Sequence, residues 1–145
     1  QFKYGGALGM KALSVNKFKA LGMIDEIKSS FEKAIQLNPK HIEARWALIE
    51  LYLKLPGIVG GSESKAIQYS NELLKISAVD GHLSRGHIDE YFKRYTKAEQ
   101  YYKKAIAVGN SRKSYQKLAN LYAYKMNSPE KAKAVLDEFK KKNDN

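Results

Sequence analysis

One pattern of apolar residues recurs along this chain of 145 residues at the spacing of an α-helix. In each clear copy, an apolar residue is followed by a larger one four positions later and by another apolar residue seven positions later. The clear copies begin at Ile27, Ala98 and Ala132, and a degenerate copy begins at Ala66. Residues with these spacings lie on one side of a helix, which must pack against neighbouring helices to bury them. The pattern therefore predicts a stack of similar helical units.

The rest of the chain also favours helices over strands. Tyr91, Tyr95 and Ala98 recur at helical spacing, as do Leu48 and Tyr52, whereas alternating strand patterns are absent. Glycines and the three prolines fall where helices should end. We therefore predict an all-α fold with eight helices, at residues 1–13, 16–38, 41–55, 62–76, 81–93, 96–108, 112–126 and 129–142.

Two stretches carry the motifs of a known repeat family. Residues 118–122 read Leu-Ala-Asn-Leu-Tyr and precede the copy that begins at Ala132, and Pro39 follows the first copy. The step from Ala98 to Ala132 is 34 residues. These features resemble the tetratricopeptide repeat (TPR), a unit of the same length. Its first helix carries W-x2-L-G-x2-Y, and its second carries A-x3-F-x2-A before a proline.

The resemblance implies a right-handed superhelical α-α solenoid of about four TPR-like helix pairs. A single domain would cover residues 1–145, with units at about 1–39, 40–78, 79–110 and 111–143. The third unit departs most from the motif, because residues 85–89 read Arg-Gly-His-Ile-Asp at the L-G-x2-Y positions. The family also implies a concave groove lined by the first helix of each unit.

The second unit is longer than the regular repeat, and the extra residues fall in a loop that contains Pro56, Gly57, Gly60 and Gly61. This Pro-Gly-Ile-Val-Gly-Gly loop resembles a variant of bacterial TPR proteins. We predict that its glycines permit an unusual turn and that Ser62 caps the next helix. The alternatives are a phosphate held by the free backbone N–H groups of that helix, or a contact with a partner.

Positive charge and tyrosine are concentrated in the C-terminal part of the chain, whose formal net charge is +11 overall. Residues 1–90 carry 12 Lys and Arg against 10 Asp and Glu, whereas residues 91–145 carry 14 against 5. A basic part could meet an acidic protein segment, nucleic acid or an anionic surface. The competing interpretation is a solvated face with tyrosines in the core. The stripes place Tyr91, Tyr95, Tyr102 and Tyr122 in that core and leave out Tyr101, Tyr115 and Tyr124.

No group of residues in the sequence points to catalysis, a metal or a cofactor. The chain has no cysteine, which excludes disulfides and thiolate chemistry. His82 and His87 are five residues apart, a poorer spacing for one metal ion than i, i+4 on a helix. Acidic pairs such as Asp89-Glu90 are adjacent in sequence, so on a helix their side chains point about 100° apart. We therefore predict no enzyme activity, no metal and no cofactor.

The resemblance implies a scaffold that binds a protein or peptide in the concave groove. The groove positions of the family correspond here to Glu43, Trp46, Glu50, His87, Lys113, Gln116, Lys117, Asn120 and Tyr124. Glu43 and Glu50 stand where the family's clamp for a C-terminal carboxylate needs neutral or basic groups. A partner with an acidic stretch near Lys113 and Lys117 is favoured instead. The alternative function is a basic helical-repeat module that binds nucleic acid or another polyanion.

The compartment stays open between the cytoplasm and export after loss of an N-terminal signal. No run approaches the ~20 apolar residues that a membrane-spanning helix needs. The chain begins at Gln1 in the middle of a helical pattern, so we expect a piece of a longer or processed protein. Lysines cover the outer side of the last predicted helix, as in a capping unit. We therefore expect further repeats before residue 1 and none after Asn145.

Overall fold

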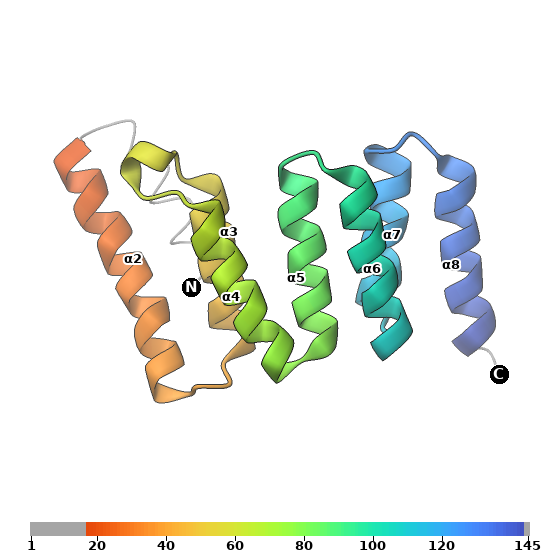
Figure 1. The fold of residues 1–145 in the computed structure, drawn as a ribbon, viewed down its shortest axis with the longest axis horizontal. Helices are drawn as coiled ribbons and strands as arrows, with labels where there is room; N and C mark the ends of the chain where they lie inside the picture. Colours follow the sequence, from red (N-terminus) through yellow and green to blue (C-terminus); the bar gives the residue numbers. More distant parts are fainter. Residues whose placement is uncertain (1–16, 144–145) are drawn as a thin grey trace. The chain divides into compact units, whose positions relative to one another are not determined.

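The computed structural model describes residues 17–143, which form seven α-helices and no strand (Figure 1). The helices are α2 (Lys17–Leu37), α3 (Ile42–Lys54), α4 (Glu63–Ile76), α5 (Ala78–Tyr91), α6 (Tyr95–Gly109), α7 (Arg112–Tyr124) and α8 (Pro129–Asn143). A short 3₁₀ helix, η1 (Gly57–Val59), lies between α3 and α4. The prediction of an all-α helical-repeat fold is confirmed. The helix predicted at residues 1–13 lies outside the described residues.

The predicted ends of the other helices agree with the observed ends to within three residues. The largest difference is at α5, which begins earlier than predicted because Ser77 caps it. Ser77 Oγ accepts a hydrogen bond from the backbone N–H of Asp80 at 3.2 Å. Gly81 therefore lies inside α5, where an added Cβ would come within 2.4 Å of the Leu74 Cα. The glycine that indicated a helix end instead permits close contact with α4.

The chain divides into two compact units, residues 1–69 and residues 70–145, with the division inside α4. The single domain predicted from the sequence stays a prediction. In the N-terminal unit α2 packs against α3. Its buried apolar side chains are Ile24, Ala44, Leu48, Ile49, Tyr52, Leu53, Val59 and Ala66.

The loop between α3 and α4 is a structured turn in the N-terminal unit. Pro56 O accepts hydrogen bonds from the N–H groups of Val59 and Gly61, both at 3.0 Å. Ser62 N then donates to Tyr52 O at 3.0 Å, which ties the end of the loop back to α3. Because Val59 is buried, the loop is held by packing as well as by hydrogen bonds.

The glycines of this loop and Ser62 have the structural roles predicted for them. Gly60 has φ 109°, in the left-handed region that favours glycine. An added Cβ on Gly61 would lie 1.8 Å from Leu55 O, so only glycine fits there. Ser62 Oγ accepts from Lys65 N at 3.1 Å and caps α4. These predictions are confirmed, whereas a role of the loop as a partner contact stays a prediction.

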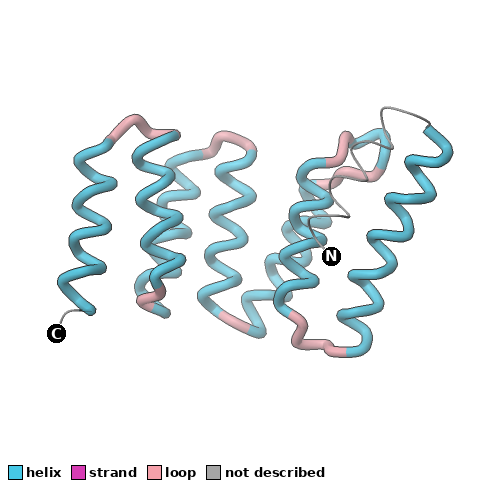
Figure 2. The backbone as a smooth tube through the Cα atoms, turned by 180° about the vertical axis from the view of Figure 1, so that it is seen from behind, coloured by secondary structure: helices cyan, strands magenta, loops and turns pink. Residues whose placement is uncertain are grey.

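In the C-terminal unit, α5, α6, α7 and α8 alternate in direction, and each packs against the next (Figure 2). The residues after α5, α6 and α7 include one non-glycine residue each in the left-handed conformation. These are Lys93 (φ 63°), Asn110 (φ 42°) and Asn127 (φ 54°). Consecutive members of this set are 17 residues apart, which is half of the 34-residue step. A left-handed residue therefore occurs at each of these three chain reversals.

The clearest copy of the apolar pattern lies at the centre of this unit. Ala98, Tyr102 and Ala105 on α6 are completely buried. On the facing helix α5, an added Cβ at Gly86 would lie 2.5 Å from the Tyr102 ring. The absence of a side chain at Gly86 therefore makes room for the largest buried side chain of α6.

The other copies of the pattern are buried to different extents. Ala66 and Leu73 are completely buried, and so is Ser70, whose hydroxyl lies 2.7 Å from the Ser84 hydroxyl. This hydrogen bond permits a polar residue at an apolar position. In the last copy Ala132 is buried but Leu136 is 41% exposed.

Two tyrosine predictions were wrong. Tyr115, expected outside the core, is buried against Phe139 with ring centroids 5.0 Å apart. It lies three residues before Leu118 and so occupies the Trp position of the W-x2-L-G-x2-Y motif. Tyr91, expected in the core, is 44% exposed beside Phe92 near the end of α5.

An ion pair replaces the motif tyrosine in the third repeat. Asp89 occupies that position and is buried, and Arg94 Nε donates to Asp89 Oδ1 at 2.8 Å. The backbone N–H of Arg94 also donates to Asp89 O at 2.8 Å. A buried carboxylate needs such a partner, because an unpaired buried charge is strongly destabilising. The departure from the motif is therefore compensated within the turn between α5 and α6.

The burial of Ala98 yields a test of the repeat register. Ala98→Glu would place a charge and extra volume in a closed core, and we expect it to reduce the free energy of unfolding by on the order of 4 kcal/mol. Ala107→Glu is the matched control, because Ala107 is exposed on the same helix and should cost at most about 0.5 kcal/mol. Urea unfolding followed by circular dichroism measures both. An unchanged midpoint for Ala98→Glu would refute the register.

Candidate functional site

In the N-terminal unit, the predicted groove residues Glu43, Trp46 and Glu50 all come from α3. Their spacing of three, four and seven residues places them on one side of that helix. Glu43 is exposed, whereas Trp46 and Glu50 are half-buried. Glu50 Oε2 lies 2.9 Å from Lys54 Nζ, so this part of α3 pairs acidic with basic groups.

The loop predicted as a second contact site is in the same unit. Pro56, Gly57 and Gly60 are exposed and Gly61 is half-buried. Ile58 is 84% exposed at the tip of η1, although the neighbouring Val59 is buried. The loop therefore presents one large apolar side chain to solvent.

In the C-terminal unit, four predicted groove residues form an exposed stripe along α7. Lys113, Gln116, Asn120 and Tyr124 are exposed, and Tyr124 is 79% exposed. Gln116 Nε2 donates to Asn120 Oδ1 at 3.0 Å, which orders the middle of the stripe. The two remaining predicted residues of this unit, Lys117 on α7 and His87 on α5, lie together, with Lys117 Nζ 3.3 Å from His87 Nδ1.

A polar network joins α5, α6 and α7 around Lys117. Its ammonium group lies 5.8 Å from the centroid of the Tyr102 ring, within the range of a cation–π contact. The Tyr102 hydroxyl donates to Glu90 Oε1 at 2.8 Å. Because an ammonium group can only donate, His87 Nδ1 is the acceptor in the contact with Lys117.

The protonation of Tyr102 keeps this network in one arrangement. Burial raises the pKa of Tyr102 far above its ordinary value, and the nearby charge of Glu90 raises it further. The hydroxyl therefore stays protonated and holds Glu90 as its acceptor. Sequence reasoning missed Glu90 and Tyr102 as parts of this site, because their contact joins α5 to α6.

A second carboxylate is held by a tyrosine between α6 and α7. The Tyr122 hydroxyl donates to Glu99 Oε2, and Lys103 Nζ lies 3.3 Å from the same oxygen. Burial alone would raise the pKa of Glu99, but the hydrogen bonds from Tyr122 and Lys103 lower it below its ordinary value. Burial and Glu99 together raise the pKa of Tyr122.

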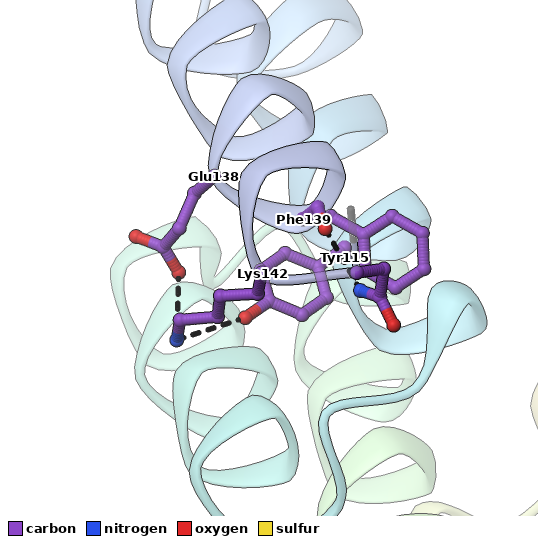
Figure 3. A network of polar contacts seen from close by, with 5 residues as sticks. Tyr115, Glu138, Phe139 and Lys142 are labelled. Carbon is purple, nitrogen blue, oxygen red and sulfur yellow. Dashed lines mark hydrogen bonds and ion pairs between the residues drawn. The ribbon is translucent and has the colours of Figure 1, made fainter. Parts of the chain in front are cut away.

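The last helix closes over Tyr115 through a third tyrosine contact (Figure 3). Lys142 Nζ donates to the Tyr115 hydroxyl at 3.2 Å and lies 3.5 Å from Glu138 Oε2. The hydrogen bond with Tyr115 raises the pKa of Lys142. Asn143 Nδ2 donates to Phe139 O at 2.8 Å and so ties the end of α8 to its own backbone. These contacts stabilise the α7–α8 pair.

Two of the three histidines, His41 and His87, make side-chain contacts of hydrogen-bond length, and His82 lies near a lysine. His41 caps α3 by accepting from Ala44 N at 3.0 Å through Nδ1. His82 and His87 each have a lysine nearby, since Lys104 helps lower the pKa of His82 after burial and Lys117 contacts His87. Within residues 17–143, no three His, Asp or Glu side chains come together as a metal site would require. None of the helices in that range is long and apolar enough to span a membrane.

Comparison with known families fits this arrangement of helices. Two segments, residues 18–41 and residues 79–108, match the sequence model described as "Tetratricopeptide repeat". The second segment covers the α5–α6 pair except for its first and last residues. These matches support the tetratricopeptide repeat family for this chain. No curated protein sequence matches it.

Several solved structures share the fold of this chain. A thermophilic TPR protein from Thermus thermophilus is 15% identical, with a TM-score of 0.62 over 96% of this chain and 90% of that one. Two structures of MamA are 19% and 16% identical, with TM-scores of 0.52 and 0.55. The alignments cover 90% and 99% of this chain, and 71% and 74% of the MamA chains. At these identities the likeness concerns the TPR fold alone.

The Tyr122–Glu99 contact gives a pH-dependent prediction for the C-terminal unit. Because folding lowers the pKa of Glu99 below its ordinary value of 4.5, its stabilisation is present above pH 4.5 and is lost as the pH falls through the lowered value. Tyr122→Phe removes the hydroxyl donor and should cost about 1–2 kcal/mol at neutral pH, with a smaller difference in acid. Thermal or urea unfolding at several pH values measures this difference.

Tyr124→Phe is the control for that series, because Tyr124 is an exposed tyrosine on the same helix. It should leave both the stability and its pH profile unchanged. A difference between Tyr122→Phe and the parent that stays constant down to acidic pH would contradict the assignment of the effect to ionised Glu99.

Proposed function

We propose that this protein is a non-enzymatic scaffold that binds another protein or a peptide. We further propose that the first-helix face of its C-terminal unit, formed by α5 and α7, binds an acidic segment of that partner. The observation that carries the proposal is the contact between His87 and Lys117, which joins the two first helices into one polar surface. The TPR fold supports a binding role, because stacked helix pairs present extended surfaces.

The charge of this face favours an acidic partner. Helix α7 contributes Arg112, Lys113 and Lys117 and contains no Asp or Glu. On α5, Glu90 is the acceptor of the Tyr102 hydroxyl, so its charge is directed towards α6. A carboxylate on a partner would meet cationic and N–H donor groups at this face, which raises the association rate and selects for acidic segments.

Exposed side chains on α7 offer contacts beyond charge. Tyr124 is 79% exposed at the end of the stripe, and tyrosine is a frequent anchor of binding interfaces. The Gln116–Asn120 pair presents amide groups that can bond to a peptide backbone. An extended segment with acidic residues near Lys113 and Lys117 and an apolar group near Tyr124 fits these positions.

The N-terminal unit offers a different surface. Trp46 lies on α3 between Glu43 and Glu50, so we propose it as an aromatic contact in an acidic and mixed-charge setting. The Pro56–Gly61 loop, which exposes the side chain of Ile58, is a further proposed contact. The acidic residues argue against recognition of a C-terminal carboxylate in this unit.

The test uses a dye-labelled peptide with a run of glutamates and a matched peptide with glutamines in their place. We expect fluorescence anisotropy to show binding of the acidic peptide that weakens as salt is added. Lys113→Glu/Lys117→Glu should weaken this binding at least about tenfold, because both lysines face the proposed site. Tyr124→Ala should weaken binding without affecting the fold, since this side chain is exposed.

Lys97→Glu/Lys133→Glu is the matched control, because it changes the net charge equally at two exposed lysines on second helices. Equal loss of affinity in this control and in Lys113→Glu/Lys117→Glu would show that only net charge matters and would overturn the site. Tighter binding of a mixed-sequence RNA than of the acidic peptide would overturn the proposed partner class. Trp46→Ala, tested with a natural partner once one is found, examines the N-terminal surface separately.

A further inference from the structure

The third repeat carries ionisable residues at all three large apolar positions of the TPR motif. With Arg85-Gly86 at the L-G positions, His82 occupies the Trp position and Asp89 the Tyr position. Asp89 is compensated by Arg94 at 2.8 Å. His82 and Arg85 are on the part of α5 that faces α6, and they require a separate explanation.

Two cations contact one tyrosine ring at this place. The Arg85 Cζ lies 5.6 Å from the centroid of the Tyr101 ring, and Lys104 Nζ lies 5.0 Å from the same centroid. Both distances are within the range of cation–π contacts. Arg85 Nε is also buried without a hydrogen-bond partner within residues 17–143. A buried donor with no acceptor costs free energy unless a ligand or water supplies one.

The carboxylates on the two helices are engaged elsewhere. On α5, Asp80 accepts from the Ser77 hydroxyl, Asp89 pairs with Arg94, and Glu90 accepts from Tyr102. On α6 the only carboxylate is Glu99, which is held by Tyr122 and Lys103. Among residues 17–143, neither Arg85 nor Lys104 has a carboxylate within ion-pair distance.

His82 lies close enough to Lys104 for its pKa to respond to the lysine charge. Burial lowers its pKa, and the charge of Lys104 lowers it further. The ring therefore stays neutral at neutral pH, where it offers an N–H donor without adding a third positive charge. Arg85 and Lys104 carry like charges and both lie beside the Tyr101 ring, so an anion that contacts both would offset their mutual repulsion.

We propose that Arg85, Tyr101 and Lys104 form a binding site for a phosphate group. The guanidinium of Arg85 supplies paired N–H donors that match phosphate oxygens, and Lys104 supplies a second charge from the next helix. A dianion matches two cations better than a single carboxylate does. The phosphate could be a free anion or the side chain of a phosphorylated residue, since both offer the same oxygens.

This site is distinct from the α5–α7 face. Arg85 and His87 are two residues apart, so their side chains leave α5 about 200° apart. Correspondingly, His87 contacts Lys117 of α7, whereas Arg85 contacts Tyr101 of α6. Loss of one binding activity therefore need not accompany loss of the other.

The test is a titration with sodium phosphate at constant ionic strength, followed by ¹H–¹⁵N NMR. We expect saturable shifts of the Arg85 Nε–H signal and of the backbone N–H signals of Tyr101 and Lys104. Lys104→Gln and Arg85→Gln should each weaken phosphate binding at least about tenfold. Lys104 is exposed, so its variant keeps the test decisive if Arg85→Gln unfolds.

Lys103→Gln is the matched control, because Lys103 neighbours Lys104 in sequence but is paired with Glu99. It should bind phosphate as the parent does, and so should Lys113→Glu/Lys117→Glu. A phosphoserine peptide that binds more tightly than phosphate, while its serine counterpart does not bind, would identify a modified protein as the source. Preference for inorganic phosphate would identify the free anion. Equal shifts with sodium chloride, or unchanged binding in Lys104→Gln, would overturn the proposal.

Discussion

The close approach of α5 and α6 at Gly86 is the constraint on which the C-terminal unit depends. Any side chain at Gly86 would collide with the Tyr102 ring, and the small residues Ala98 and Ala105 are completely buried one turn to either side. This packing fixes Tyr102 between the helices, where its hydroxyl reaches Glu90 and its ring contacts Lys117. The polar network that joins α5, α6 and α7 therefore depends on position 86 being glycine.

Tyrosine hydroxyls account for much of the charge distribution of this unit. Tyr102 and Tyr122 each hold a carboxylate, Glu90 and Glu99 respectively, and both phenols stay protonated because burial and the neighbouring charge raise their pKa. Carboxylates held in this way are directed into the helix contacts, and Glu99 also pairs with Lys103 of its own helix. The positive charge seen in the composition is thereby separated into local sites, one at the α5–α7 face and one around Tyr101.

The sequence predicted the elements that follow from local periodicity and missed the contacts that follow from tertiary packing. Helix positions were predictable because the apolar residues recur at helical spacing, and burial of Ala98 and Ala105 followed from the repeat register. His87 and Lys117 were predicted as members of one surface through the family pattern, although 30 residues separate them. The Tyr102–Glu90 bond was not predictable, because its geometry depends on how closely α5 and α6 pack. Gly81 was misjudged as a helix end, since glycine serves both turns and close helix contacts.

The left-handed residues Lys93, Asn110 and Asn127 divide the C-terminal unit into steps of 17 residues. The turn within a helix pair and the turn between pairs thus share one spacing, although the repeat motif itself distinguishes first from second helices. An insertion or deletion inside a helix that is not a multiple of this step shifts the apolar side of that helix away from the core. Natural length variation in this unit should therefore occur as whole helices or within the turns themselves. The 17-residue spacing of the left-handed residues then provides a register for aligning the sequences of relatives.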